Sequence, residues 1–142
     1  MDALLLDSRL LELIYLLSEH KKEHAQSTGR SHKERIERVV AMIKKDPSAD
    51  LSLARVAEYA SFSPIHFHSC FKRSTGKTLR EFVEEERLSR AIELLVSTDM
   101  TLSEIAYASG FSSQAYFSAV FKKRKGIPPR EYVRELQKRY EK

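Results

Sequence analysis

The sequence predicts an all-α fold that contains two copies of one helical unit, on three observations: composition, an internal repeat and regularly placed helix starts. Apolar residues make up 42% of the 142-residue chain, enough for an ordinary packed core. Glycine and proline occur only four times each, which favours helices over turn-rich sheets. The length fits one domain or two very small ones.

The internal repeat has a period of about 50 residues. LSLARVAEYASFSPIHFHSCFKRSTGKTLREFV, which begins at Leu51, aligns with MTLSEIAYASGFSSQAYFSAVFKKRKGIPPREYV, which begins at Met100, with one extra residue in the second copy after its FS pair. The matched pairs are Leu53 and Leu102, Ala57 and Ala106, Phe62 and Phe111, Phe67 and Phe117, Phe71 and Phe121, and Gly76 and Gly126. A duplicated unit presents one surface twice, which suits a repetitive partner.

Helix starts are marked by capping boxes, in which a Ser or Thr is followed three residues later by Glu. They occur at Ser31, Thr78 and Thr101, and Ser63-Pro64 is a further start with proline in the first helical position. The expected helices cover residues 3–23, 32–45, 52–59, 64–74, 79–97, 102–108, 114–125 and 130–140.

Each repeat therefore reads as a short helix, a tight connection and a second helix, closed by Gly76 or Gly126. This is a helix-turn-helix arrangement. The first motif covers about 51–74 and the second about 101–125, and a linker helix at about 79–97 joins them. At 1.5 Å per residue that helix separates the motifs by roughly 25–30 Å, close to the DNA repeat of about 34 Å.

Basic residues gather in the second half of each repeat. No acidic residue lies between Glu58 and Glu81, or between Glu104 and Glu131, although both segments contain several Lys and Arg residues. This local excess suits a phosphate backbone. The alternative is an ordinary solvated lysine surface.

A 100° projection of the helix at 64–74 places Phe67, Cys70 and Phe71 on its buried stripe. The equivalent stripe in the second copy is Phe117, Val120 and Phe121. The outer faces carry small, apolar and hydrogen-bonding residues, which suit a groove roughly 12 Å wide.

His66 and Cys70 are four residues apart and can share a metal ion, whereas His68 lies about 160° from Cys70 on the same helix. Structural zinc usually takes four ligands, so no metal site and no cofactor are expected. Cys70 is interpreted as a core residue because it aligns with Val120. A redox sensor would need an exposed, activated thiolate.

No catalytic constellation is found, so the chain is not expected to be an enzyme. Glu84, Glu85 and Glu86 read as a charged helix face, and His20, His24 and His32 as solvated side chains. A single cysteine, no recognisable secretory start and no apolar stretch of about 20 residues together predict a cytoplasmic protein without a membrane role.

The region from about Ser31 to Leu136 closely resembles the double helix-turn-helix DNA-binding domain of bacterial AraC/XylS-type transcription regulators. IAYASGFSSQAYFSAVFKKRKGIPPREY carries the most specific part of the resemblance, and RLSRAIELL looks like the linking helix. The resemblance implies promoter binding, contacts with RNA polymerase and an activator role. Residues 31–142 are accordingly expected to form the DNA-binding domain.

The resemblance also implies roles for individual side chains. The expected contacts to DNA bases are Ile65, His68, Ser69, Gln114, Ala115, Tyr116, Ser118 and Ala119. The expected contacts to DNA phosphates are Lys72, Arg73, Lys77, Lys122, Lys123, Arg124 and Lys125.

Two positions depart from the family pattern. Family members commonly have arginine where this chain has Ser69, and again where it has Ala119. An arginine bound to guanine through two hydrogen bonds is worth about 1–3 kcal/mol of discrimination. Its absence is consistent with an AT-rich target read through methyl groups and shape, with a weaker binder that depends on dimerisation, or with a protein altered from its natural form.

Residues 1–30 lie outside the resemblance. Leu6, Leu10, Leu13 and Leu17 recur at heptad-like spacing, and Ser27-Thr28-Gly29 is expected to end their helix. This leucine-rich helix is interpreted as a homodimer contact, as a helix packed on its own domain, or as the tail of a preceding sensor domain. The alternative function is a protein interaction module, or a weakly specific DNA binder, that associates through this helix.

Overall fold

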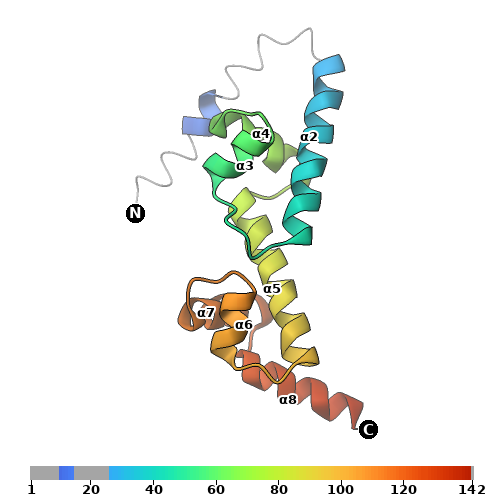
Figure 1. Ribbon diagram of the computed structural model, residues 1–142, viewed down its shortest axis with the longest axis vertical. Coiled ribbons are helices and arrows are strands. Elements are labelled where there is room, and N and C mark those ends of the chain that lie inside the picture. The colour runs from blue at the N-terminus through green and yellow to red at the C-terminus, as the bar shows by residue number, and fades with distance from the viewer. Residues whose placement is uncertain (1–9, 15–25, 142) are drawn as a thin grey trace. The chain divides into compact units, whose positions relative to one another are not determined.

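The computed structural model describes residues 10–14 and 26–141, with side chains from residue 31 onward in the second range. Figure 1 shows the helices in chain order. They are α2 (Gln26–Lys45), α3 (Leu53–Tyr59), α4 (Pro64–Thr75), α5 (Leu79–Ser97), α6 (Leu102–Ala108), α7 (Gln114–Lys125) and α8 (Pro129–Tyr140). Residues 10–14 are also helical, and the described ranges contain no strand. The prediction of an all-α fold is confirmed.

The predicted helix starts follow from local capping. The hydroxyl of Ser63 accepts a hydrogen bond from the His66 amide at 3.2 Å. Thr101 and Glu104 form a complete capping box, because each side chain accepts from the other residue's backbone amide. Thr78 and Glu81 form the same reciprocal pair at the start of α5.

The predicted start at Ser31 is wrong, because α2 begins at Gln26 and runs without a break through residues 27–29. A glycine inside a helix costs only about 1 kcal/mol, which packing of the apolar stripe can offset. Ile36, Val39 and Ile43 form that stripe and are fully buried. The predicted helix at 3–23 lies outside the described residues except for residues 10–14.

The chain divides into two compact units. Unit 1 comprises Met1–Lys45 and Asp50–Phe82, and unit 2 comprises Asp46–Ala49 and Val83–Lys142. Unit 1 packs α4 against both α2 and α3. Its core contains Phe67 and Phe71, whose stacked ring centroids lie 5.4 Å apart.

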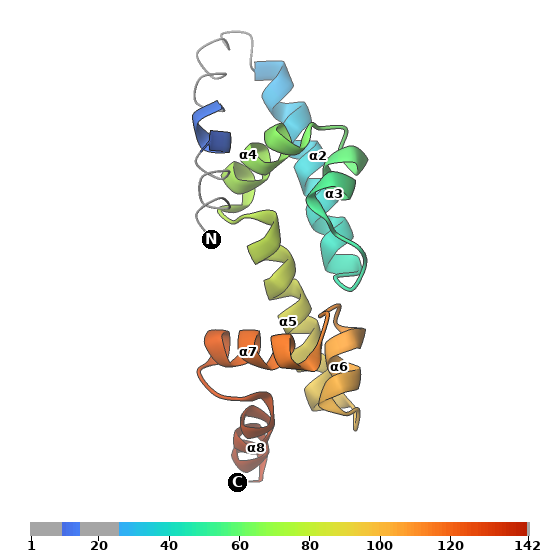
Figure 2. The same cartoon turned by 90° about the vertical axis from the view of Figure 1, so that its left-hand side faces the viewer.

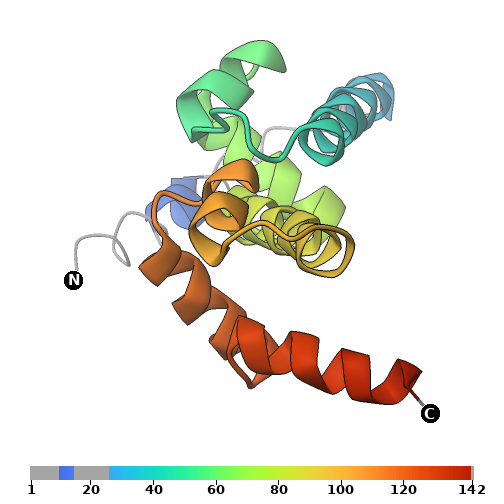
Figure 3. The ribbon, with the colours of Figure 1, turned by 60° about the horizontal axis from the view of Figure 1, so that its bottom comes forward.

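Unit 2 repeats this packing with α5, α6 and α7, and α8 forms its C-terminal end (Figure 3). Its core consists of Leu88, Ala91, Ile105, Ala106, Phe111, Phe117, Val120 and Phe121. The aligned phenylalanines and alanines of the two copies are all buried. The sequence repeat is thus a repeat of core positions.

The duplication extends further upstream than the motifs themselves. RIERVVAMI in α2 aligns with RLSRAIELL in α5, so Arg35 corresponds to Arg87. Arg35 donates from Nε to the Ala60 carbonyl at 2.7 Å and also bonds the Ser61 carbonyl. Arg87 donates to the carbonyls of Pro47 at 2.7 Å and Ala49 at 3.0 Å. The aligned arginines both donate to backbone carbonyls of their own unit, but to different segments: Arg35 bonds the turn between α3 and α4, and Arg87 bonds residues that precede α3 in the chain.

The turn inside each motif needs a left-handed backbone. Ser61 has φ of 58° in the first copy, and Gly110 has φ of 93° in the second. A side chain at Gly110 would also collide with its surroundings, because a Cβ atom there would lie 2.7 Å from the Ser48 Cα and 2.8 Å from Arg87 Nε. Only glycine fits at this position.

Candidate nucleic-acid interface

The first predicted recognition helix, α4, leaves part of its surface outside the core. Phe67, Cys70 and Phe71 are buried, as the projection predicted. Ile65 is 40% exposed, whereas His68 and Ser69 are half-buried. The core interpretation of Cys70 is confirmed.

Two of these predicted base contacts have distinct surroundings. The Ser69 hydroxyl donates to the Ile65 carbonyl of its own helix at 3.3 Å. Toward a further partner it can therefore act only as a hydrogen-bond acceptor, through its oxygen lone pairs. His68 Nε2 is buried and has no hydrogen-bond partner among the described residues. The structure thus encloses one ring nitrogen of a side chain that was expected to face a groove.

The second predicted recognition helix, α7, exposes more of its outer face. Its first two residues, Gln114 and Ala115, are exposed, as is Ala119, while Ser118 is half-buried. Ser113 caps the helix by accepting from the Tyr116 amide at 3.1 Å. This face combines an amide, a hydroxyl and small groups, the types that read base edges and thymine methyls.

Tyr116 is 38% exposed, but its hydroxyl is engaged within unit 2. It donates to Glu84 Oε2 of α5 at 2.9 Å. Glu84 and Glu85 also pair with Arg124, with N to O distances of 3.5 Å and 3.2 Å. Glu84 and Glu85 were read from sequence as a charged face, and the link was missed because it joins residues about thirty or more positions apart.

The predicted phosphate contacts form one group in each unit. In unit 1, Lys72 and Arg73 lie in the last turn of α4 and Lys77 follows the helix, and in unit 2 residues 122–125 form the last turn of α7. All are exposed except Lys77, which is half-buried. Basic side chains in a last helical turn also stabilise the helix dipole, so their placement serves the fold as well as a ligand.

Lys72 is already paired inside unit 1. Its Nζ donates to Glu12 Oε1 at 2.8 Å, and this contact brings helical residues 10–14 beside α4 (Figure 2). The hydrogen bond and charge of Glu12 raise the pKa of the Lys72 ammonium. The sequence did not indicate that Glu12 would compete with phosphate for Lys72, or that Glu84 and Glu85 would compete with phosphate for Arg124.

The leucine-rich seam is described only in part. Leu10 is 52% exposed and Leu13 is 57% exposed, and Ile14 beside them is also exposed. Leu6 and Leu17 lie outside the described residues. The two described leucines do not pack into the core of unit 1.

The expectation that His32 is solvated is wrong. Its half-buried ring packs edge-to-face against Phe62, with centroids 5.1 Å apart, and against His66, with centroids 4.8 Å apart. His32, His66 and Cys70 thereby bring their nitrogen and sulfur atoms within 4.8 Å of one another. Sequence reasoning considered only ligands on one helix, and the third comes from α2. His20 and His24 lie outside the described residues.

No helix in the described part of the chain is long and apolar enough to cross a membrane.

Comparison with known proteins identifies the repeated unit. A family model described as a helix-turn-helix domain matches residues 56–135, more than half of the chain and both α4 and α7. The bifunctional transcriptional activator/DNA repair enzyme AdaA of Bacillus subtilis is 31% identical over 103 residues, which cover 72% of this chain and 48% of AdaA. The chain spans about half the length of the first curated relatives it matches.

Solved structures give the same answer. The C-terminal domain of AraT, a response regulator from Geobacillus stearothermophilus, is 34% identical and matches with a TM-score of 0.67 over 71% of this chain and 84% of that domain. A transcriptional regulator from Chromobacterium violaceum, described as containing an AraC-type DNA-binding domain, is 28% identical with a TM-score of 0.66, over 72% of this chain and 91% of that one. Both likenesses extend over more than two thirds of the residues in this chain.

Proposed function

The chain belongs to the AraC family of helix-turn-helix DNA-binding transcription regulators, and we propose that it binds specific double-stranded DNA through α4 and α7. One observation carries the proposal: the two copies bury the same phenylalanine stripe and leave the opposite side of each second helix outside the core. The last turn of each of these helices carries basic residues. Such a repeated surface suits a partner that is itself periodic and anionic.

In this proposal the outer side chains of α4 and α7 contact base edges in two successive major grooves. Gln114 supplies an amide of the kind that pairs with adenine, while Ile65 and Ala115 supply apolar contact for thymine methyl groups. The basic residues after these side chains contact phosphates and set the position of each helix on the duplex. Lys122 and Lys123 are the strongest such candidates, since both side chains are exposed.

The absence of arginine at Ser69 and Ala119 points to the kind of target. Without a side chain that bonds guanine twice, discrimination depends on apolar contacts, on single hydrogen bonds and on DNA shape. We therefore expect an AT-rich site. The Ser69 hydroxyl, which donates to its own helix, would accept a hydrogen bond from a base rather than donate one.

The broader role follows the family and the names of its relatives. AdaA is named a transcriptional activator, and we propose that this chain also activates transcription, with contacts to RNA polymerase, in the cytoplasm of a bacterium. We propose that it acts by binding and not by catalysis. A homodimer through the leucine-rich seam would double the number of DNA contacts.

The second candidate function is protein association through that same seam. The exposure of Leu10 and Leu13 favours it, because exposed leucines at heptad-like spacing suit a partner helix. In that case the protein would keep the helix-turn-helix fold but would not bind DNA with strong sequence specificity. The two functions differ in their salt dependence, because apolar association is not screened by salt.

Selection of bound duplexes from a random pool, followed by fluorescence anisotropy titration of the winners, tests the proposal. We expect an enriched AT-rich sequence and an affinity that falls steeply with added salt. No enrichment, together with binding no tighter than about 1 mM at low salt, would refute DNA recognition. Salt-independent self-association of the same protein would then favour the second function.

A further inference from the structure

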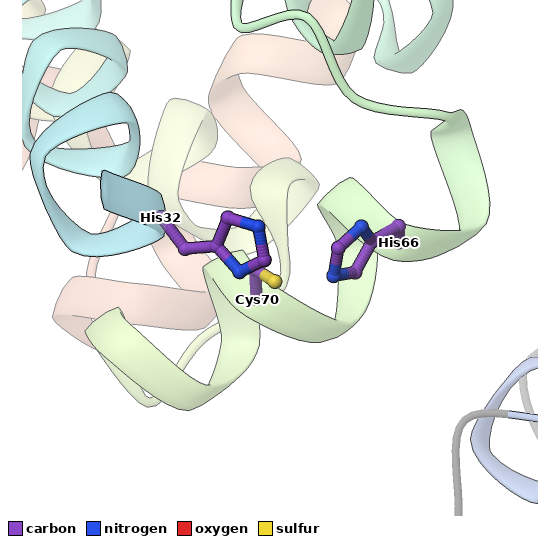
Figure 4. Close-up of side chains that lie close together, drawn as sticks. All are labelled: His32, His66 and Cys70. Atoms are coloured by element: carbon purple, nitrogen blue, oxygen red, sulfur yellow. The ribbon is translucent and has the colours of Figure 1, made fainter. Parts of the chain in front are cut away.

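Three side chains that can bind metals converge in unit 1. His32 comes from α2, and His66 and Cys70 come from α4, where they lie one helical turn apart. Figure 4 shows the two imidazole rings and the sulfur atom turned toward a common space. Each residue offers one ligand atom, and these atoms all lie within 4.8 Å of one another.

These separations are close to those of a metal centre. Zinc binds imidazole nitrogen at about 2.0–2.1 Å and thiolate sulfur at about 2.3 Å, so tetrahedral ligand atoms lie roughly 3.4–3.7 Å apart. The cluster would have to contract by about 1 Å or slightly more, which rotation of the side chains can supply. His66 and Cys70 lie at positions i and i+4 of one helix, a spacing that allows two side chains to bind the same zinc ion.

The surroundings favour capture of a metal by these groups. Cys70 is buried and both histidines are half-buried, so the ligands are shielded from bulk water. His32 and Cys70 also line a cavity of about 450 Å³ that includes Glu37, Lys33 and Arg73. The cavity opens on two of the three ligands and is large enough for water as the fourth ligand, and the Glu37 carboxylate offsets part of the positive charge of Lys33 and Arg73.

The second copy shows that these ligands are not demanded by the fold. In the alignment, His32 corresponds to Glu84, His66 to Tyr116 and Cys70 to Val120. Unit 2 joins its first helix to its recognition helix through the hydrogen bond between Tyr116 and Glu84. Unit 1 places two imidazoles at the same two positions, and a thiol where unit 2 has a valine.

We propose that His32, His66 and Cys70 bind one zinc ion, which links α2 to α4 in unit 1. The ligand set of two imidazoles and one thiolate suits zinc among the divalent ions. Binding replaces the thiol proton of Cys70, which passes to solvent, with a sulfur–zinc bond. The site goes beyond the proposed DNA recognition and does not depend on it.

Cobalt titration of the full chain tests this proposal. Cobalt occupies zinc sites and produces a thiolate-to-metal charge-transfer band, and Cys70 is the only cysteine, so any such band reports this site. We expect a saturable band with one equivalent of cobalt and its loss when zinc is added. Zinc at a hundredfold excess over its Kd should raise the melting temperature by roughly 5–10 °C.

The repeat supplies variants that preserve packing. Cys70→Val and His66→Tyr install the aligned residues of unit 2, and both should abolish tight cobalt binding and the thermal shift. His32→Gln should weaken cobalt binding at least tenfold. His68→Gln removes a histidine of the same helix outside the cluster and should retain cobalt binding, although its DNA affinity is expected to change.

Two results would overturn the site. One is a folded wild-type chain that shows no charge-transfer band up to about 1 mM cobalt. The other is a band that persists at full strength in both His66→Tyr and His32→Gln, which would leave Cys70 bound to metal without these partners. Circular dichroism of each variant establishes that it is folded, and the wild-type titration requires no variant at all.

Discussion

Tyr116 donates a hydrogen bond to Glu84 at 2.9 Å, and so connects the first turn of α7 to α5 within unit 2. The same tyrosine is a proposed base contact, which gives its hydroxyl two competing roles. Glu84 also accepts from Arg124, a proposed phosphate contact. The link between these three residues therefore ties the position of α7 to groups that DNA would also engage.

Tyr116→Phe should lower the free energy of unfolding of unit 2 by about 0.5–1.5 kcal/mol, because it removes one hydrogen bond and leaves the ring in place. Urea unfolding followed by circular dichroism measures the loss. Tyr107→Phe is the matched control, since Tyr107 is an exposed tyrosine of the same unit. Equal effects from the two variants would contradict a stabilising role for the Tyr116 hydroxyl.

Replacing Lys122 and Lys123 with alanine should weaken binding to every duplex and flatten its salt dependence. Two lost phosphate contacts predict a slope of log K against log salt that is shallower by roughly 1.8. Alanine at Lys138 and Arg139, exposed residues in the last turn of α8, removes the same charge and should change the slope less. An unchanged slope in the first variant would exclude Lys122 and Lys123 as phosphate contacts.

Glu12→Gln should strengthen DNA binding, because it releases Lys72 from its ion pair. An exposed pair of this kind is worth about 0.2–1 kcal/mol, which corresponds to an affinity gain of roughly 1.4- to 5-fold. Anisotropy titrations at several salt concentrations measure the gain. The control is the same substitution in a chain that already carries Lys72→Ala. Adding Glu12→Gln to Lys72→Ala should not change DNA affinity, and a gain that survives there must come from another contact.

Gly110→Ala should destabilise unit 2 by about 2–4 kcal/mol, since it adds left-handed strain to a collision with the Ser48 backbone and with Arg87. Gly126→Ala is the matched control in the same unit. It also has a positive φ, but a Cβ there meets open space, so we expect about 1–2 kcal/mol. Chemical denaturation of both variants compares the two, and similar losses would mean that the close approach at Gly110 is relieved at little cost.

The capping box of α6 should make stability depend on pH. Hydrogen bonds from Thr101, first from its backbone amide, hold the pKa of the Glu104 carboxyl below its ordinary value of 4.5. A carboxyl with a lowered pKa stabilises the fold above its unfolded-state pKa, and this contribution disappears as the pH falls through the folded-state value. The wild-type chain should therefore lose more stability than Glu104→Gln as the pH falls from about 5 to about 3. Parallel pH dependences of unfolding would contradict this account.

Helices α3 to α8 could be predicted from the sequence to within one residue at each end. Their boundaries depend on local chemistry: a Ser or Thr cap at one end of several, and a left-handed glycine after α4 and α7. The start of α2 could not be predicted in this way, because the helix passes through Ser31 and a preceding glycine that the same local rules treat as a boundary.

The candidate site was predictable only where one helix decides it. Projection correctly separated buried Cys70 from exposed Ile65. It could not bring His32 of α2 to His66, or Glu84 of α5 to Tyr116, because those contacts depend on packing between helices. Alignment of the two copies, continued upstream to Arg35 and Arg87, would have shown that these two pairs occupy corresponding positions, so that one contact would have indicated the other.

Residues 46–49 follow α2 in sequence, yet they belong to unit 2, where Arg87 holds the carbonyls of Pro47 and Ala49. The chain therefore cannot be divided into its two units at a single peptide bond. A fragment that begins at Val83 would leave the arginine of α5 without these two acceptors, and a fragment that ends at Phe82 would keep a loop whose hydrogen-bond donor is gone. Any attempt to exchange one half between regulators has to carry these four residues with the other half.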